Sequence, residues 1–259
     1  MKRIIKKTVI KLFNPLAVRL GYVKENKTQK KKISLETKKG LLFNFYNVLK
    51  EMNFTPKHIV DVGANHGTWT REALKYFPNA QYSLFEPQYW LEKSIQDITA
   101  TNNNVKFNAF GVGKEKGTFK FTIVDRDDSC SFKYTEEEAK SKGFEQVDLP
   151  VITLNNFFKE NNLTTPDIIK IDAEGLDLEV LQGASDFFGK TEIFLVEAAV
   201  VNNNIDNTVL KVLEYMDSKG YKLFEITDLN RPFKPKVLWL VELVFVKKDG
   251  IIDNFKIIK

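Results

Sequence analysis

The chain has 259 residues, of which 43% are hydrophobic and 12% aromatic, enough for one domain of ordinary size with a dense core. Its single cysteine, Cys130, excludes a disulfide framework and favours a reducing, cytoplasmic compartment. The charge is uneven: residues 1–32 hold eleven basic residues and one acid, whereas the remainder holds 28 basic and 33 acidic residues. A mildly acidic body argues against a nucleic-acid-binding protein, which needs a basic face.

Residues 1–32 are predicted to form a basic arm, separate from a folded domain at 33–259. On a helix, Ile5, Val9 and Leu12 share one face, and Pro15 should interrupt that helix. Lysines break every apolar run, which argues against a signal peptide and against a spanning helix of about 20 apolar residues. Two interpretations remain. Either the arm lies on an anionic membrane surface, at the inner face of the membrane, or it packs on the body.

From residue 57 onward, apolar runs of strand length alternate with amphipathic helical segments. This pattern predicts an α/β fold, with a mostly parallel sheet covered by helices on both faces. The last two runs are joined only by a Pro-containing loop, which predicts an antiparallel hairpin at the sheet edge. The predicted strands are 58–63, 81–87, 105–112, 167–175, 192–200, 221–226 and 238–248, and the predicted helices are 68–77, 89–100, 177–188 and 206–219.

Residues 113–150 interrupt this alternation. The run 117–125 is predicted as an extra strand, and a polar loop with a helix should follow it. Long loops in compact domains tend to be functional. We therefore expect a substrate-facing insertion, with a solvated excursion of no function as the alternative.

The first predicted strand ends in an acid and a glycine-rich turn, "DVGANHG", with the pattern D-x-G-x-x-x-G at Asp61, Gly63 and Gly67. It matches neither G-x-x-x-x-G-K-[ST] nor G-x-G-x-x-G, so neither a phosphate loop nor a pyrophosphate site is predicted. The remaining candidate for this turn is a nucleoside ligand without phosphate. Gly63 would let that ligand approach the backbone, and Gly67 would let the following helix pack closely.

The second predicted strand ends at Glu86, just before Pro87. A carboxylate there can accept hydrogen bonds from both hydroxyls of a ribose. The end of the third strand, from Asn108 to Gly111, would border the adenine. An acid, two glycines and a second acid at the next strand end fit S-adenosylmethionine, a ribonucleoside with an amino acid tail and no phosphate.

The fourth predicted strand reads "IIKIDAEG" and places charged residues in an apolar run. Side chains alternate along a strand, so Lys170, Asp172 and, if the chain stays extended, Glu174 should point the same way. The next strand ends at Glu197, so three carboxylates are expected to gather. They would form a divalent metal site or supply a general base. The two histidines are weaker candidates, because His58 begins a strand and His66 lies in the glycine turn.

The stretches "VDVGANHGTWT", "SLFEP" and "PDIIKIDAEGLDLEVLQGA" resemble the FkbM family of S-adenosylmethionine-dependent methyltransferases. The resemblance implies a seven-stranded class I fold with an antiparallel last strand. It also implies methylation of hydroxyls, often on sugars of bacterial surface glycans, glycolipids or polyketide-type products. The cofactor-binding residues predicted from the pattern and the family together are Asp61, Gly63, Ala64, Asn65, Gly67, Thr70, Glu86, Pro87, Asn108, Gly111 and Asp172.

For catalysis we predict Asp172 as the base, Glu174 and Glu197 as helpers or metal ligands, and Lys170 as the residue that orients them. The sequence departs from the family in two places. "TLNN" (153–156) replaces the family's "TLDD", and Ala198 and Ala199 follow Glu197 where many relatives carry a histidine.

The expected acceptor is a hydroxyl of a glycan, a glycolipid or another small molecule, and the oligomeric state is left open. Two alternatives stand beside this prediction. One is a catalytically inactive, methyltransferase-like scaffold at a membrane complex, and the other is a methyltransferase for a non-carbohydrate small molecule. Amino-directed nucleic-acid methyltransferases usually carry N/D-P-P-Y/F after the fourth strand. Here the turn reads Ala173-Glu174-Gly175, so no nucleic acid is expected.

Overall fold

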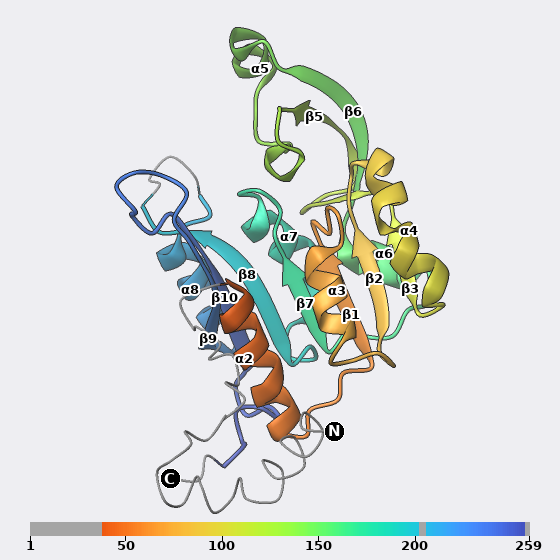
Figure 1. Cartoon of the computed structure of the whole chain (residues 1–259), viewed down its shortest axis with the longest axis vertical. Helices are drawn as coiled ribbons and strands as arrows, with labels where there is room; N and C mark the ends of the chain where they lie inside the picture. Colours follow the sequence, from red (N-terminus) through yellow and green to blue (C-terminus); the bar gives the residue numbers. More distant parts are fainter. Residues whose placement is uncertain (1–37, 202–205, 257–259) are drawn as a thin grey trace, which may run out of the picture. The chain divides into compact units, whose positions relative to one another are not determined.

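The computed structural model describes residues 38–201 and 206–256, so the predicted arm at 1–32 lies outside the described residues. The large sheet has seven strands in the order β3-β2-β1-β7-β8-β10-β9 (Figure 1). Its strands are β3 (Val105–Asn108), β2 (Gln81–Phe85), β1 (His58–Val62), β7 (Ile168–Ile171), β8 (Ile193–Ala199), β10 (Leu240–Lys247) and β9 (Tyr221–Asn230). Nowhere in the described chain is there a helix long and apolar enough to cross a membrane.

The pairing of these strands confirms the predicted α/β fold. Strands β3, β2, β1, β7 and β8 pair in parallel, whereas β10 lies antiparallel between β8 and β9. This is the class I methyltransferase order, with the last strand inserted beside the edge strand. The predicted hairpin of the last two strands is therefore confirmed.

Helices cover both faces of the large sheet. Side chains alternate along the strands, so Ile59 of β1 packs into one core and Val60 into the other. The first core is covered by α2 (Lys38–Glu51), α3 (Thr68–Leu74) and α4 (Glu92–Thr101). The second is covered by α6 (Leu154–Glu160), α7 (Asp177–Gly183) and α8 (Val209–Ser218).

Two helices were not predicted. Helix α2 buries Leu42, Phe45, Tyr46 and Leu49, a helical spacing that the sequence does contain. Helix α6 starts after Thr153, whose side chain accepts a hydrogen bond from the backbone N–H of Asn156 and so caps the helix.

Two predicted strands were too long. The one at 105–112 is divided, because β3 ends at Asn108 and β4 (Gly111–Val112) joins a different sheet. The one at 167–175 ends at Ile171, and positive φ angles of 53° at Glu174 and 96° at Gly175 then turn the chain.

The insertion at 113–150 forms a small sheet in the order β4-β6-β5, with β5 (Gly117–Ile123) antiparallel to β6 (Glu145–Ile152). Figure 1 shows this sheet and α5 (Glu136–Lys142) extending from one end of the large sheet. Thr135 and Glu138 form a capping box at the start of α5, which confirms the predicted helix. Cys130 packs with Phe121 and Leu149 in a separate small core.

Substituting Gly63 should show how closely two strand ends approach. A Cβ on Gly63 would lie 1.9 Å from the carbonyl oxygen of Asp172, and φ is +71°. We expect Gly63→Ala to lower the free energy of unfolding by more than about 3 kcal/mol. Gly189→Ala is the matched control, because its φ is +76° and nothing lies within 4 Å, and it should cost about 1–2 kcal/mol. Equal losses in denaturant titrations would contradict the steric explanation.

Candidate functional site

The turn between β1 and α3 is shaped by left-handed backbone at Gly63, Asn65 and Gly67. The N–H groups of Gly63 and Ala64 donate to the carbonyl of Phe85, at 2.9 and 3.1 Å, and fasten the turn to β2. Gly63 is needed because the backbone of Asp172 occupies the place of its Cβ. On the sequence alone, this glycine was explained by the approach of a ligand. The structure explains it by the approach of the backbone at Asp172.

A buried ion cluster lies beneath this turn. Lys170 Nζ lies 3.3 Å from a carboxylate oxygen of Asp61 and 3.3 Å from one of Asp172. Burial by itself would lower the pKa of Lys170, but the charges of Asp172 and Asp61 outweigh it and raise that pKa. Thr70 Oγ1 donates to Asp61 at 2.6 Å. Lys170 and Asp172 lie together, as the strand alternation predicted.

Glu86 lies at the end of β2 with both carboxylate oxygens in hydrogen bonds. One oxygen accepts from the N–H of Asn65 at 2.8 Å, and the other accepts from the backbone and side-chain N–H groups of Gln88 at 3.0 and 3.1 Å. Burial raises the pKa of Glu86, and these hydrogen bonds partly offset the rise. The carboxylate is therefore held in one orientation.

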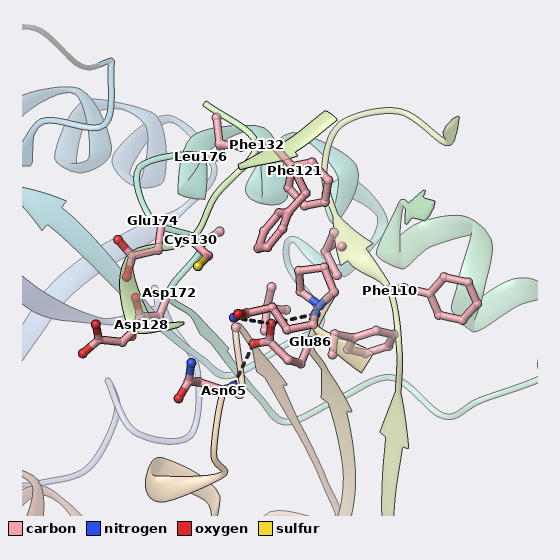
Figure 2. Close-up of a pocket in the computed structure, with 18 of the residues that line it drawn as sticks. Asn65, Glu86, Phe110, Phe121, Asp128, Cys130, Phe132, Asp172, Glu174 and Leu176 are labelled. Carbon is pink, nitrogen blue, oxygen red and sulfur yellow. Dashed lines mark hydrogen bonds between the residues drawn. The ribbon is translucent and has the colours of Figure 1, made fainter. Parts of the chain in front are cut away.

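Glu86 opens into a cavity of about 630 Å³ including its mouth, which we call the inner pocket. Figure 2 shows the acids Asp128, Asp172 and Glu174 on one side of this pocket and phenylalanine rings on the other. The predicted site residues that line it are Gly63, Asn65, Glu86, Pro87, Gly111, Asp172 and Glu174. The aromatic residues that line it are Phe85, Phe110, Phe121 and Phe132.

A second, larger cavity adjoins the inner pocket, and we call it the outer cleft. Its volume is about 2210 Å³ including open space at its mouth. The two cavities share Gly63, Asn65, Asp128, Asp172 and Glu174. Its aromatic lining comes from α2, α3 and the residues just after it, the insertion and the β9–β10 connection: Phe43, Tyr46, Trp69, Tyr76, Tyr134, Phe233 and Trp239.

The three predicted carboxylates Asp172, Glu174 and Glu197 all line the outer cleft. Burial, together with the charge of Asp172, raises the pKa of Glu174 to about 8. Burial, together with the charges of Asp172, Asp177 and Glu174, raises the pKa of Glu197 well above its usual value. Within the described residues, no three His, Cys, Asp or Glu side chains are arranged to hold a metal ion. In this arrangement Asp172 pairs with Lys170, and the metal-ligand role considered for Asp172, Glu174 and Glu197 stays a prediction.

Asp177 supports the turn that carries Glu174. Its carboxylate is fully buried and accepts hydrogen bonds from the N–H groups of Ala173 and Gly175, at 3.1 and 3.3 Å, and from Asn207 at 2.8 Å. Burial raises the pKa of Asp177 to about 7. This acid of the sequence motif holds the backbone and does not line either cavity.

Not every predicted residue reaches a cavity. Ala64, Lys170 and Glu197 line only the outer cleft. Neither cavity is lined by Asp61, Gly67, Thr70 or Asn108. Asp61 instead pairs with Lys170 and accepts a hydrogen bond from Thr70. Gly67 has φ +70°, and a Cβ there would meet Arg71 of α3 as well as Ile95 and Ile98 of α4.

The insertion supplies several of the lining residues that the sequence did not single out, and it is fastened to the glycine turn. Asp127 pairs with His66 Nε2 at 2.6 Å, and its carbonyl accepts from Gln88 Nε2 at 2.9 Å. Asp127 lines the inner pocket, and Arg126 and Lys133 line the outer cleft. One segment thus forms a wall of both cavities, and its unusual length was the only signal in the sequence.

The sheet order, the glycine turn and the acid at the end of β2 define a class I methyltransferase. The sequence profile of the methyltransferase FkbM domain matches residues 61–223, more than half of the chain. The chain therefore belongs to the FkbM methyltransferase family.

Individual relatives are distant. The chain is 26% identical over 145 residues to "Methyltransferase 1" of Beauveria bassiana (strain ARSEF 2860); the match covers 49% of this chain and 58% of that protein. The FkbM methyltransferase structure from Methylobacillus flagellatus KT is 16% identical with a TM-score of 0.49; the match covers 72% of this chain and 43% of that one. A Burkholderia thailandensis N1-methyltransferase, solved with S-adenosylhomocysteine, is 11% identical with a TM-score of 0.42; coverage is 94% and 89%.

Removing the Asp127 carboxylate should loosen the insertion locally. Both side chains of the His66–Asp127 pair are more than 40% exposed, so the pair contributes only about 0–1 kcal/mol to global stability. We expect Asp127→Ala to speed amide hydrogen exchange in residues 125–132 while the unfolding midpoint stays nearly unchanged. Asp125→Ala, at an exposed neighbouring acid, is the control. Unchanged exchange in the Asp127 variant would show that the pair does not hold the segment.

Proposed function

We propose that the protein transfers a methyl group from S-adenosylmethionine to a hydroxyl of a sugar, in a surface glycan or glycolipid. The observation that carries this proposal is the meeting of two cavities at Asp172 and Glu174. The inner pocket has the size and lining for a nucleoside, and the outer cleft is open and rich in aromatic side chains.

The charges of the inner pocket support this cofactor. Its lining contains the acids Glu86, Asp127, Asp128, Asp172 and Glu174, and no lysine or arginine among the described residues. A phosphate-bearing nucleotide would be repelled there, whereas a ligand with a sulfonium and an ammonium group would be attracted. Glu86 suits a ribose diol, and the phenylalanines suit a purine ring.

When bound, S-adenosylmethionine supplies a methyl group on a positively charged sulfur, and the chain's own residues prepare the acceptor. An alkyl hydroxyl is a weak nucleophile at neutral pH, so a base must take its proton as the oxygen–methyl bond forms. The leaving group would be S-adenosylhomocysteine, which would keep the electron pair of the broken carbon–sulfur bond.

Glu174 is the proton acceptor that the geometry favours, ahead of Asp172. Its carboxylate makes no hydrogen bond or ion pair shorter than 4.0 Å with another described residue, and its pKa of about 8 lies near the working range of a general base. Its φ of +53° is unusual for a residue with a side chain, as is common at functional sites. Asp172, fixed by Lys170, would orient the hydroxyl.

The outer cleft supports a sugar acceptor. Aromatic faces pack against the C–H faces of sugar rings, and carboxylates accept hydrogen bonds from hydroxyl groups. The cleft offers Trp69, Trp239 and Phe233 beside Glu174 and Glu197. A cleft of about 2210 Å³ also leaves room for more than one sugar ring.

Replacing Glu86 should weaken cofactor binding. We expect Glu86→Ala to lower the affinity for S-adenosylhomocysteine by roughly 10–100-fold, because hydrogen bonds to a charged group contribute about 1.5–3 kcal/mol. Isothermal titration calorimetry measures this change, and Glu92→Ala, at an exposed acid on α4, serves as the control. Wild-type affinity in the Glu86 variant would remove the ribose contact, and no binding by the intact chain would remove the cofactor.

The pH dependence of turnover should identify the base. A base must be ionised to accept a proton, so kcat/KM should rise about tenfold per pH unit up to a pKa of about 8 and then level off. We expect Glu174→Gln to lower turnover by roughly 100-fold or more and to remove this rise. Transfer of labelled methyl groups to a glycolipid extract is the measurement.

The Asp172→Asn variant distinguishes the role of Asp172 from that of Glu174. It should keep affinity for S-adenosylhomocysteine within a few-fold and lower turnover, while the rise with pH persists. Loss of the pH dependence in Asp172→Asn, with retention in Glu174→Gln, would reverse the two assignments.

A further inference from the structure

The connection between β9 and β10 is a solvent-exposed loop that carries both basic and apolar side chains. All seven residues at 231–237 are exposed, and they include Arg231, Lys234 and Lys236 but no acid. Phe233 is 54% exposed and Val237 is 44% exposed. The loop thus presents two apolar side chains and three cations within seven residues.

This loop is ordered by its own contacts. Arg231 donates to the carbonyl of Lys236 and Lys236 donates to the carbonyl of Arg231, both at 3.0 Å. The ring of Phe233 packs edge-on against Trp239, with centroids 4.9 Å apart. The apolar side chains are therefore presented from a folded loop.

The loop adjoins further exposed apolar residues. Val200 and Val201, at the end of β8, are 41% and 45% exposed. The N–H of Val200 donates to the carbonyl of Trp239 at 2.9 Å, which ties the two segments together. Figure 1 shows the loop, in dark blue, at the carboxyl end of β8. We call residues 231–237 with Val200 and Val201 the basic rim.

The basic rim borders the mouth of the outer cleft. Pro232, Phe233 and Trp239 line the same cleft as Asp172 and Glu174. A surface that binds the rim would therefore present its molecules to the cleft. The delivery of an acceptor to the cleft rests on the proposed function, whereas binding of a surface by the rim does not.

We propose that the basic rim docks on an anionic lipid membrane and that the acceptor reaches the outer cleft from that membrane, attached to a lipid. Phe233 and Val237 enter the boundary between headgroups and acyl chains, and the cations face lipid phosphates. Charge complementarity selects this partner, because three cations without an acid match an anionic surface.

Vesicle sedimentation of the full chain tests the proposal, without cofactor or acceptor, so that failure of the methyltransferase assignment would not affect it. The wild type should bind phosphatidylcholine–phosphatidylglycerol vesicles, less so in high salt, and should bind pure phosphatidylcholine weakly. Lys234→Gln with Lys236→Gln should lower the partition coefficient about tenfold or more. Phe233→Ser should lower it as well. The matched controls are Lys140→Gln with Lys142→Gln on α5 and Phe119→Ser on β5, and all three positions are exposed.

A probe in the loop separates its binding from that of residues 1–32. Cys130 is buried, so an environment-sensitive dye on the Val237→Cys protein reports position 237. A blue shift with anionic vesicles supports docking of the rim. Partitioning of the lysine variant equal to wild type, or an unchanged emission on bound vesicles, would overturn the proposal. Binding to heparin but not to vesicles would overturn it too, in favour of a soluble polyanion.

Discussion

The site depends on one buried cation. Lys170 lies between Asp61 of β1 and Asp172 after β7, and its Nζ also lies 3.4 Å from the carbonyl of Gly63. A buried charge without partners is costly, and removing one partner from such a cluster typically costs about 3–5 kcal/mol. The ends of two central strands and the glycine turn are thus tied to one point. Asp172 can keep a fixed position in an open cavity because its partner is inside the sheet.

The acids around the two cavities differ through their surroundings. Glu86 is oriented by three hydrogen bonds from Asn65 and Gln88, which suits a rigid recognition group. Asp177 is buried under the turn and holds backbone N–H groups. Glu174 is carried on that turn with its carboxylate turned to the cavities. The fold therefore gives the same chemical group three different surroundings, which differ in burial and in the number of hydrogen-bond partners.

Sequence reasoning succeeded where the determinant was local. Strand periodicity placed Lys170 and Asp172 on one side, and the apolar runs predicted the sheet. It did not indicate that Thr70, at the start of the predicted helix 68–77, is buried and donates a hydrogen bond to Asp61. It could not find the contact of Asp127 with His66, because 61 residues separate them and nothing in either segment specifies the other. Long-range contacts between loops need the folded structure.

The position of β10 has a consequence for how the chain folds during synthesis. Strand β9 precedes β10 in the chain, yet it reaches the sheet only through β10, which pairs with β8 on one side and β9 on the other. Until Leu240–Lys247 leaves the ribosome, β8 has an open edge of unpaired N–H and C=O groups beside a buried apolar strand. Such an edge can pair with another chain. The nascent protein is therefore exposed to such pairing in the interval after β8 has formed and before β10 has left the ribosome.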